Sequence, residues 1–79
     1  MISVKDRMRL RLAGAHYAYP AQRENDALEQ LGETPTSFWL RVDLSLDDPE
    51  ALAAEPQIVG RLRRLREARA KVRAADRAS

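Results

Sequence analysis

The sequence predicts an all-α fold, a small domain of four or five helices with a helix-turn-helix-like centre and a protruding basic C-terminal helix. Thr34 and Asp48 are each followed by proline, and a polar N-cap before proline at the first helical position is typical of a helix start. Gly32 can adopt the positive φ that ends a helix. Residues 21–46 are therefore predicted to form a helix, a bend and a second helix, which is the order found in a helix-turn-helix.

The first helix is expected within residues 3–18. Apolar residues recur there at spacings of three and four, which would place these side chains on one face: Val4, Met8, Leu12, Ala15 and Tyr19. Leucines and arginines also alternate over residues 7–12, as they would in a half-buried strand. The helix is favoured because the alternation stops at Ala13 and few residues are β-branched. Pro20 should end the helix.

The second and third helices are expected over residues 21–31 and about 36–46. The later segment also alternates apolar and polar residues like a strand. Helix is favoured because of the start signal at Thr34-Pro35, and because a lone strand would have no partner. A structure with a paired strand at residues 36–46 would contradict the helix-turn-helix interpretation.

Two further helices are expected, a short one at about residues 49–54 and a last one from Pro56 toward Ala75. In the last helix Arg69 stands where the next inward leucine would fall, so the part beyond residue 65 has little to bury. We therefore expect a domain over residues 1–65 and a basic arm over residues 66–79. The expected core comprises Met8, Leu12, Tyr19, Ala27, Leu28, Leu31, Phe38, Val42, Leu46, Leu52, Ile58, Leu62 and Leu65.

Charge is distributed unevenly along the chain, although the formal net charge is only +2. Residues 1–11 carry four cations and one acid, residues 20–55 two cations and nine acids, and residues 57–79 eight cations and two acids. Arginine binds phosphate through two donors, so the basic segment is a candidate nucleic-acid contact. The candidate phosphate-binding residues are Arg61, Arg63, Arg64, Arg66, Arg69, Lys71 and Arg73. The candidate base-reading residues on the third helix are Thr36, Ser37 and Arg41.

The central helices are acidic, and this opposes a role in reading DNA. Arg41 is the one cation between Glu33 and Glu50, and acids in a recognition helix repel phosphates. The bend could equally be a structural corner in a helical bundle. The alternative hypothesis is a protein-interaction module that docks on a basic partner, such as the transcription machinery, through the acidic centre and Trp39.

The run at residues 48–56, DPEALAAEP, is followed by Val59, Arg61, Leu62, Arg63, Arg64, Leu65, Arg66 and Arg69. This pattern resembles a family of small actinobacterial proteins catalogued as a domain of unknown function. The resemblance extends over about residues 16–75 and includes the aromatic residues at 17 and 19, the Leu31-Gly32 bend and the Phe38-Trp39 pair. It implies a small helical domain with a helix-turn-helix-like centre, often guessed to bind DNA. Glu33 departs from the small or apolar residue usual after the bend.

Several function classes are not expected from this sequence. It holds no cysteine and one histidine, His16, and no metal-ligand spacing or glycine-rich phosphate loop. We expect neither an enzyme nor a cofactor. No stretch approaches the roughly 20 apolar residues of a membrane span, and arginines interrupt the N-terminal segment where a signal peptide would be apolar. A cytoplasmic location and no membrane partner are therefore expected. A homo-oligomer is also left open.

Overall fold

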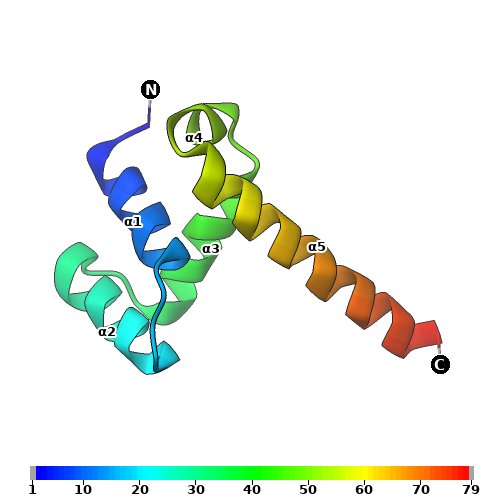
Figure 1. Cartoon of the computed structure of the whole chain (residues 1–79). Helices are drawn as coiled ribbons and strands as arrows, with labels where there is room; N and C mark the ends of the chain where they lie inside the picture. The colour runs from blue at the N-terminus through cyan, green and yellow to red at the C-terminus, as the bar shows by residue number, and fades with distance from the viewer. Residues whose placement is uncertain (1, 79) are drawn as a thin grey trace.

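The computed structural model describes residues 2–78, and this part of the chain contains five helices and no strand. The helices are α1 (Val4–Gly14), α2 (Pro20–Leu31), α3 (Pro35–Leu46), α4 (Pro49–Ala54) and α5 (Pro56–Ala78). The predicted all-α fold is confirmed. In Figure 1, α1, α3 and α4 lie beside the beginning of α5, α2 packs on α1 and α3 on the far side, and the rest of α5 extends away. The division at residue 65 and the helix-turn-helix assignment stay predictions, and residues 1 and 79 lie outside the described part.

Local capping signals explain why the boundaries of the middle helices match the prediction. The Thr34 hydroxyl accepts a hydrogen bond from the Ser37 amide at 3.3 Å. The Asp48 carboxylate accepts one from the Glu50 amide at 2.9 Å. Gly32 ends α2 with φ at 67°, a left-handed conformation that glycine adopts without steric cost. The predicted helix at residues 36–46 is confirmed, and α5 runs three residues past the expected end at Ala75.

The first helix is shorter than predicted and faces the core with a different side. It ends at Gly14, and Ala15 is already extended, with ψ at 151°. The predicted inward stripe is wrong, since Val4 is 78% exposed and Met8 37% exposed. The physical reason is Arg9, which is 3% exposed and forms a buried ion pair with Glu33 after the corner between α2 and α3. That ion pair turns the face carrying Arg9 inward.

The core consists of two adjoining clusters of buried side chains. The first contains Ala13, Ala27, Leu31, Phe38 and Val42, and the second contains Leu10, Leu46, Ala51 and Val59. Leu12, Leu52, Ile58 and Leu62 are partly buried against these clusters. Four residues of the predicted core are exposed: Met8, Tyr19, Leu28 and Leu65.

Each misplacement has a structural cause. Tyr19 lies in extended backbone before Pro20, so the periodicity of α1 does not reach it. Leu28 is at the edge of the buried face of α2, about 100° around the helix from Ala27. Leu65 lies one turn beyond Leu62, where α5 begins to leave the body. The sequence analysis missed four buried apolar positions, which are Leu10, Ala13, Ala51 and Val59.

Gly14 allows the end of α1 to approach α5 closely. A β-carbon built at Gly14 would lie 2.8 Å from Ile58 Cγ2, closer than carbon atoms normally come. The α1 backbone therefore contacts Ile58 directly at this point, and no side chain larger than hydrogen fits without a shift of α5.

Candidate nucleic-acid interface

Three of the predicted phosphate-binding arginines bind groups within the protein. Arg61 donates a hydrogen bond to the Gly14 carbonyl at the end of α1, and Arg63 donates one to the Leu46 carbonyl at the end of α3. Carbonyl groups at the end of a helix carry partial negative charge, so arginine is favourable there. These arginines join helix ends to α5, and their donors are partly occupied before any ligand arrives.

Arg66 forms an ion pair with two aspartates of the α3 end. Its Nη1 lies 3.0 Å from Asp43 Oδ1 and its Nη2 lies 2.8 Å from Asp47 Oδ1. The hydrogen bond from Arg66 lowers the pKa of Asp47 below its ordinary value. All three side chains are at least 40% exposed, so solvent screens the pair and its contribution to stability is small. The two aspartates therefore balance the charge of Arg66 before any external anion arrives.

The remaining cations of α5 are exposed and have no acid partner among residues 2–78. They are Arg64, Arg69, Lys71, Arg73 and Arg77. Arg64, Arg69, Lys71 and Arg73 of the predicted set are thus available to an external anion. Arg77, which the sequence analysis did not select, belongs to the same exposed segment.

The available cations lie on two sides of α5. Arg69, Arg73 and Arg77 follow one another at intervals of four residues and share a face with Leu62, which packs on the body. Arg64 and Lys71 point to the opposite side by helical periodicity. The row of three arginines therefore continues, on the arm, the side of α5 that meets α3.

The structure separates the predicted base-reading residues of α3. Arg41 Nε lies 3.4 Å from Ser37 Oγ, so these two side chains share a flank of the helix. Thr36 is exposed on a different side, by helical periodicity. Between them, the centre of the solvent face holds Leu40 and Leu44, which are 59% and 64% exposed. Two leucines in this place offer no donor or acceptor for base edges.

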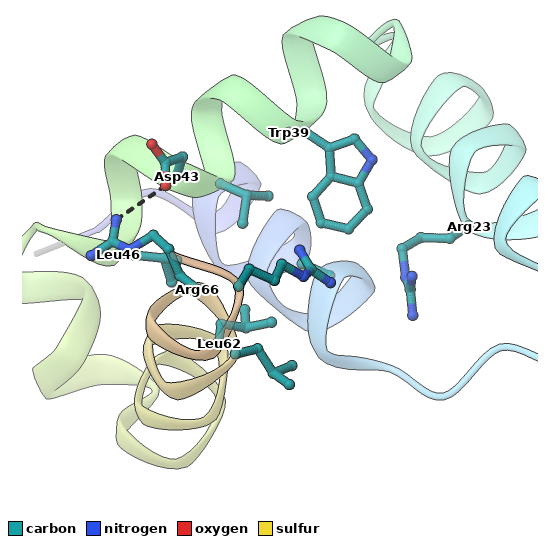
Figure 2. A pocket seen from close by; sticks show the side chains of 10 residues that line it. Arg23, Trp39, Asp43, Leu46, Leu62 and Arg66 are labelled. Atoms are coloured by element: carbon teal, nitrogen blue, oxygen red, sulfur yellow. Dashed lines mark hydrogen bonds and ion pairs between the residues drawn. The ribbon is translucent and has the colours of Figure 1, made fainter. Parts of the chain in front are cut away.

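Trp39 is partly exposed and belongs to a cluster of aromatic and cationic groups. Its ring meets Phe38 edge-on, with the ring centroids 5.0 Å apart, and 37% of the residue remains accessible. The guanidinium carbon of Arg23 lies 5.8 Å from the indole centroid and 5.0 Å from the Tyr17 ring centroid. Figure 2 shows Trp39 between Arg23 on one side and the α5 residues Leu62 and Arg66 on the other.

Arg23 is the main site residue that sequence reasoning missed. It is half-buried, although charged residues are ordinarily exposed. Its Nε donates to the Leu12 carbonyl at 3.0 Å and its Nη2 donates to the Ala15 carbonyl at 2.7 Å. Tyr17 is held nearby because its hydroxyl donates to Asp26 Oδ2 at 2.6 Å, a bond that raises the pKa of Tyr17. No local signal identifies Arg23, because its partners are on another helix.

Within residues 2–78, no group of three or more histidine, cysteine, aspartate or glutamate side chains is arranged to hold a metal ion. None of the helices in that range is long and apolar enough to span a membrane. The candidate interface is therefore built from arginines and one tryptophan.

Comparison with known proteins places the chain in a family. No curated protein matches it, and no solved structure does. Residues 1–74 match a family described as "Protein of unknown function (DUF3263)". The matched range contains α1 to α4 and all of α5 except its last residues. This range contains the corner between α2 and α3, Trp39 and the arginines up to Arg73. The chain belongs to the DUF3263 family of proteins of unknown function.

Proposed function

We propose that this protein is a small, non-enzymatic nucleic-acid-binding accessory or regulatory protein that contacts phosphates mainly through α5. The observation that supports this is the set of five exposed cations on α5 without an acid partner within residues 2–78. Neutralising phosphates with such side chains releases counterions, which supplies sequence-independent affinity. Arg61, Arg63 and Arg66 hold α5 on the body, so the cations beyond them carry the contact.

The third helix is not the main contact in this proposal. Its solvent face combines Leu40 and Leu44 with Asp43 and Asp47 on the flank. Leucines on the solvent face of a recognition helix offer no hydrogen bond to a base. Aspartates on its flank repel the phosphates. Arg41 and Ser37 are expected to contribute little.

A salt titration tests the proposal. Binding to labelled duplex and single-stranded DNA is followed by fluorescence anisotropy over a range of salt concentrations. For the parent, the logarithm of the affinity should fall linearly with the logarithm of salt, with a slope of about −0.9 per phosphate contacted on duplex or about −0.7 on a single strand. The triple variant R69A/R73A/R77A should bind more weakly and with a flatter slope.

The matched control removes the same charge from the body of the protein, as K5A/R11A/R41A. Its affinity should stay close to that of the parent, with thermal melts confirming that both triple variants are folded. Alanine is at least as good a helix former as arginine, so the arm variant should keep its helix. Absence of binding by the parent at low salt, or an equal loss in both variants, contradicts the proposal.

A second candidate function is protein docking through α3, as the acidic centre and Trp39 suggest. The observation that favours it is the pair of exposed leucines, Leu40 and Leu44, one turn apart beside the partly exposed Trp39. Apolar groups with Asp43 and Asp47 on one flank suit a basic protein surface. Pull-down from a lysate with and without nuclease separates the two functions. Partners that persist after nuclease and are lost in L40S/L44S would favour docking.

A further inference from the structure

A groove opens where α5 leaves the body, between α3 and residues 62–69 of α5. Its volume is about 400 Å³. Ala13, Val42, Leu46 and Leu62 supply its apolar lining, and Trp39 supplies an aromatic wall. Figure 2 shows the indole directed across the groove from Leu62. The space is large enough for one flat, partly apolar group.

Three arginines and one aspartate line the same groove: Arg23, Arg66, Arg69 and Asp43. Asp43 and Asp47 balance the charge of Arg66. Arg23 is hydrogen-bonded to the neutral carbonyls of Leu12 and Ala15, so its charge is not balanced by those bonds. Arg69 has no acid partner within residues 2–78. An apolar lining with uncompensated positive charge at its edge favours a ligand that combines an aromatic group with an anion.

The charge continues from the groove along the arm. Arg69 lies at the groove, and Arg73 and Arg77 follow on the same face, each about 6 Å further along the helix axis. Ala70 and Ala74 lie beside this row, Val72 shares a shallow hollow with Arg69 and Arg73, and Asp76 falls between Arg73 and Arg77. Guanidinium groups repeated at one-turn intervals suit the repeated charge of a phosphodiester backbone.

An unpaired base fits this arrangement, and a paired base does not. Bases of a single strand can turn out of the stack and contact an aromatic side chain or an arginine plane, whereas the bases of a duplex are already stacked. A single strand that follows Arg73 and Arg69 toward the body reaches the indole of Trp39 next. A rigid duplex on the same row would bring its phosphates toward the acids at the end of α3.

We propose that the groove between α3 and α5 binds one unpaired base of a single-stranded nucleic acid against Trp39, while Arg69 and Arg73 hold the adjoining phosphates. This inference rests on the proposed function of α5. It adds that the nucleic acid is single-stranded and that Trp39 distinguishes a single strand from a duplex. Arg23 has a positioning role, because it holds the end of α1 and lies over the indole.

Trp39 is the only tryptophan, so its emission reports on this groove alone. The full chain is titrated with oligothymidylate, with oligouridylate and with duplex DNA, each about 20 nucleotides long, enough for one small binding site. Emission of Trp39 and anisotropy of a labelled strand are recorded in parallel at low salt. Binding of the single strands should quench the emission and exceed duplex binding about tenfold. The two single strands show whether the site prefers DNA or RNA.

Variants separate the groove from the arm. Trp39→Ala should reduce single-strand affinity about tenfold and leave duplex affinity unchanged. Because Trp39 packs on Phe38, Arg69→Ala provides a test that does not alter the core. It should weaken single-strand binding more than its matched control Arg64→Ala, which removes the same charge from the opposite side of α5.

The outcomes distinguish this inference from the function on which it rests. Equal affinity for duplex and single strands without a change in Trp39 emission overturns the groove and leaves binding by α5 in place. No binding of any nucleic acid overturns both. Quenching by an acidic, aromatic peptide but not by the oligonucleotides reassigns the groove to a protein partner. Equal effects of Arg69→Ala and Arg64→Ala also contradict the inference.

Discussion

Arg9 and Glu33, which are 24 residues apart, form a two-point ion pair inside the protein. Arg9 Nε lies 2.8 Å from Glu33 Oε1, and Arg9 Nη2 lies 2.5 Å from Oε2. Arg9 is 3% exposed and Glu33 6% exposed. Arg9 also donates a hydrogen bond to Asp6 at 2.5 Å. The pair joins α1 to the corner between α2 and α3, and so fixes which side of α1 faces the core.

Removing one member of this pair should destabilise the protein strongly. Glu33→Ala leaves the Arg9 charge buried with only Asp6 beside it, and a buried pair broken in this way costs about 3–5 kcal/mol. Urea unfolding followed by Trp39 emission measures the loss. Lys5→Ala is the control, because Lys5 lies 3.9 Å from the same carboxylate but is 57% exposed. Its effect should stay within about 1 kcal/mol, as for other exposed pairs. Equal effects of the two substitutions would show that the Arg9 contact is solvated.

Stability should fall in acid because of the same carboxylate. Hydrogen bonds from Arg9 hold the pKa of Glu33 below its ordinary value of 4.5, and the bond from Arg9 likewise lowers the pKa of Asp6. The unfolded chain therefore takes up protons before the folded one as the pH falls. This contribution is fully present above the ordinary carboxylate pKa and is lost as the pH drops through the lowered values. Urea midpoints from about pH 6 to about pH 3 should show the loss, and Glu33→Gln should show less of it. A parental midpoint independent of pH would contradict the lowered pKa.

Gly14 and Gly60 should respond to alanine in opposite ways, although both are helical. A methyl group at Gly14 would meet Ile58 Cγ2 at 2.8 Å, and overpacking of this kind costs about 1–3 kcal/mol. At Gly60 the nearest group is the end of the Arg64 side chain at 3.6 Å, so alanine gains about 0.5–1 kcal/mol of helix propensity. Thermal melts of the two variants compare them directly. Stabilisation by Gly14→Ala would mean that α1 and α5 are further apart than described.

Phe38 should be one of the most sensitive positions in the chain. Its ring is fully buried, and truncating such a side chain to alanine costs about 3–5 kcal/mol. Leu40→Ala, two residues along the same helix, should change the unfolding free energy by only about 0.5 kcal/mol because Leu40 is 59% exposed. Chemical unfolding followed by circular dichroism serves both variants. If Phe38→Ala melts like the parent, α3 is rotated from the orientation described above.

The features predictable from the sequence are those governed by neighbouring residues. The Thr34 and Asp48 caps and the Gly32 turn act within one helical turn, and the boundaries of α2, α3 and α4 follow from them. The order of helices and the buried stripe of Phe38, Val42 and Leu46 follow from the same local signals. The extended basic end of the last helix follows from the failure of its apolar stripe at Arg69.

The features that were not predictable depend on contacts between distant residues. Periodicity cannot identify Arg9 as a buried residue, because its partner Glu33 is on another segment and charged residues are ordinarily exposed. The roles of Arg23, Arg61 and Arg63 were missed for the same reason, since each donates to a carbonyl of another helix. In the candidate site, the sequence identified the arginines as a group. The sequence could not show which of these arginines bind groups within the protein, because those contacts depend on how α5 packs on the body.

The arginines that bind carbonyl groups at helix ends also affect how easily different parts of the protein open locally. The end of α1 is held by Arg23 and Arg61, and the end of α3 by Arg63. Neither end can fray alone, because fraying would also break a contact made by a different helix. We therefore expect the amides near these helix ends to exchange with solvent mainly when the body opens as a unit. The turns of α5 after Arg66 have no such links, so their amides exchange by local fraying, which grows toward the C-terminal end.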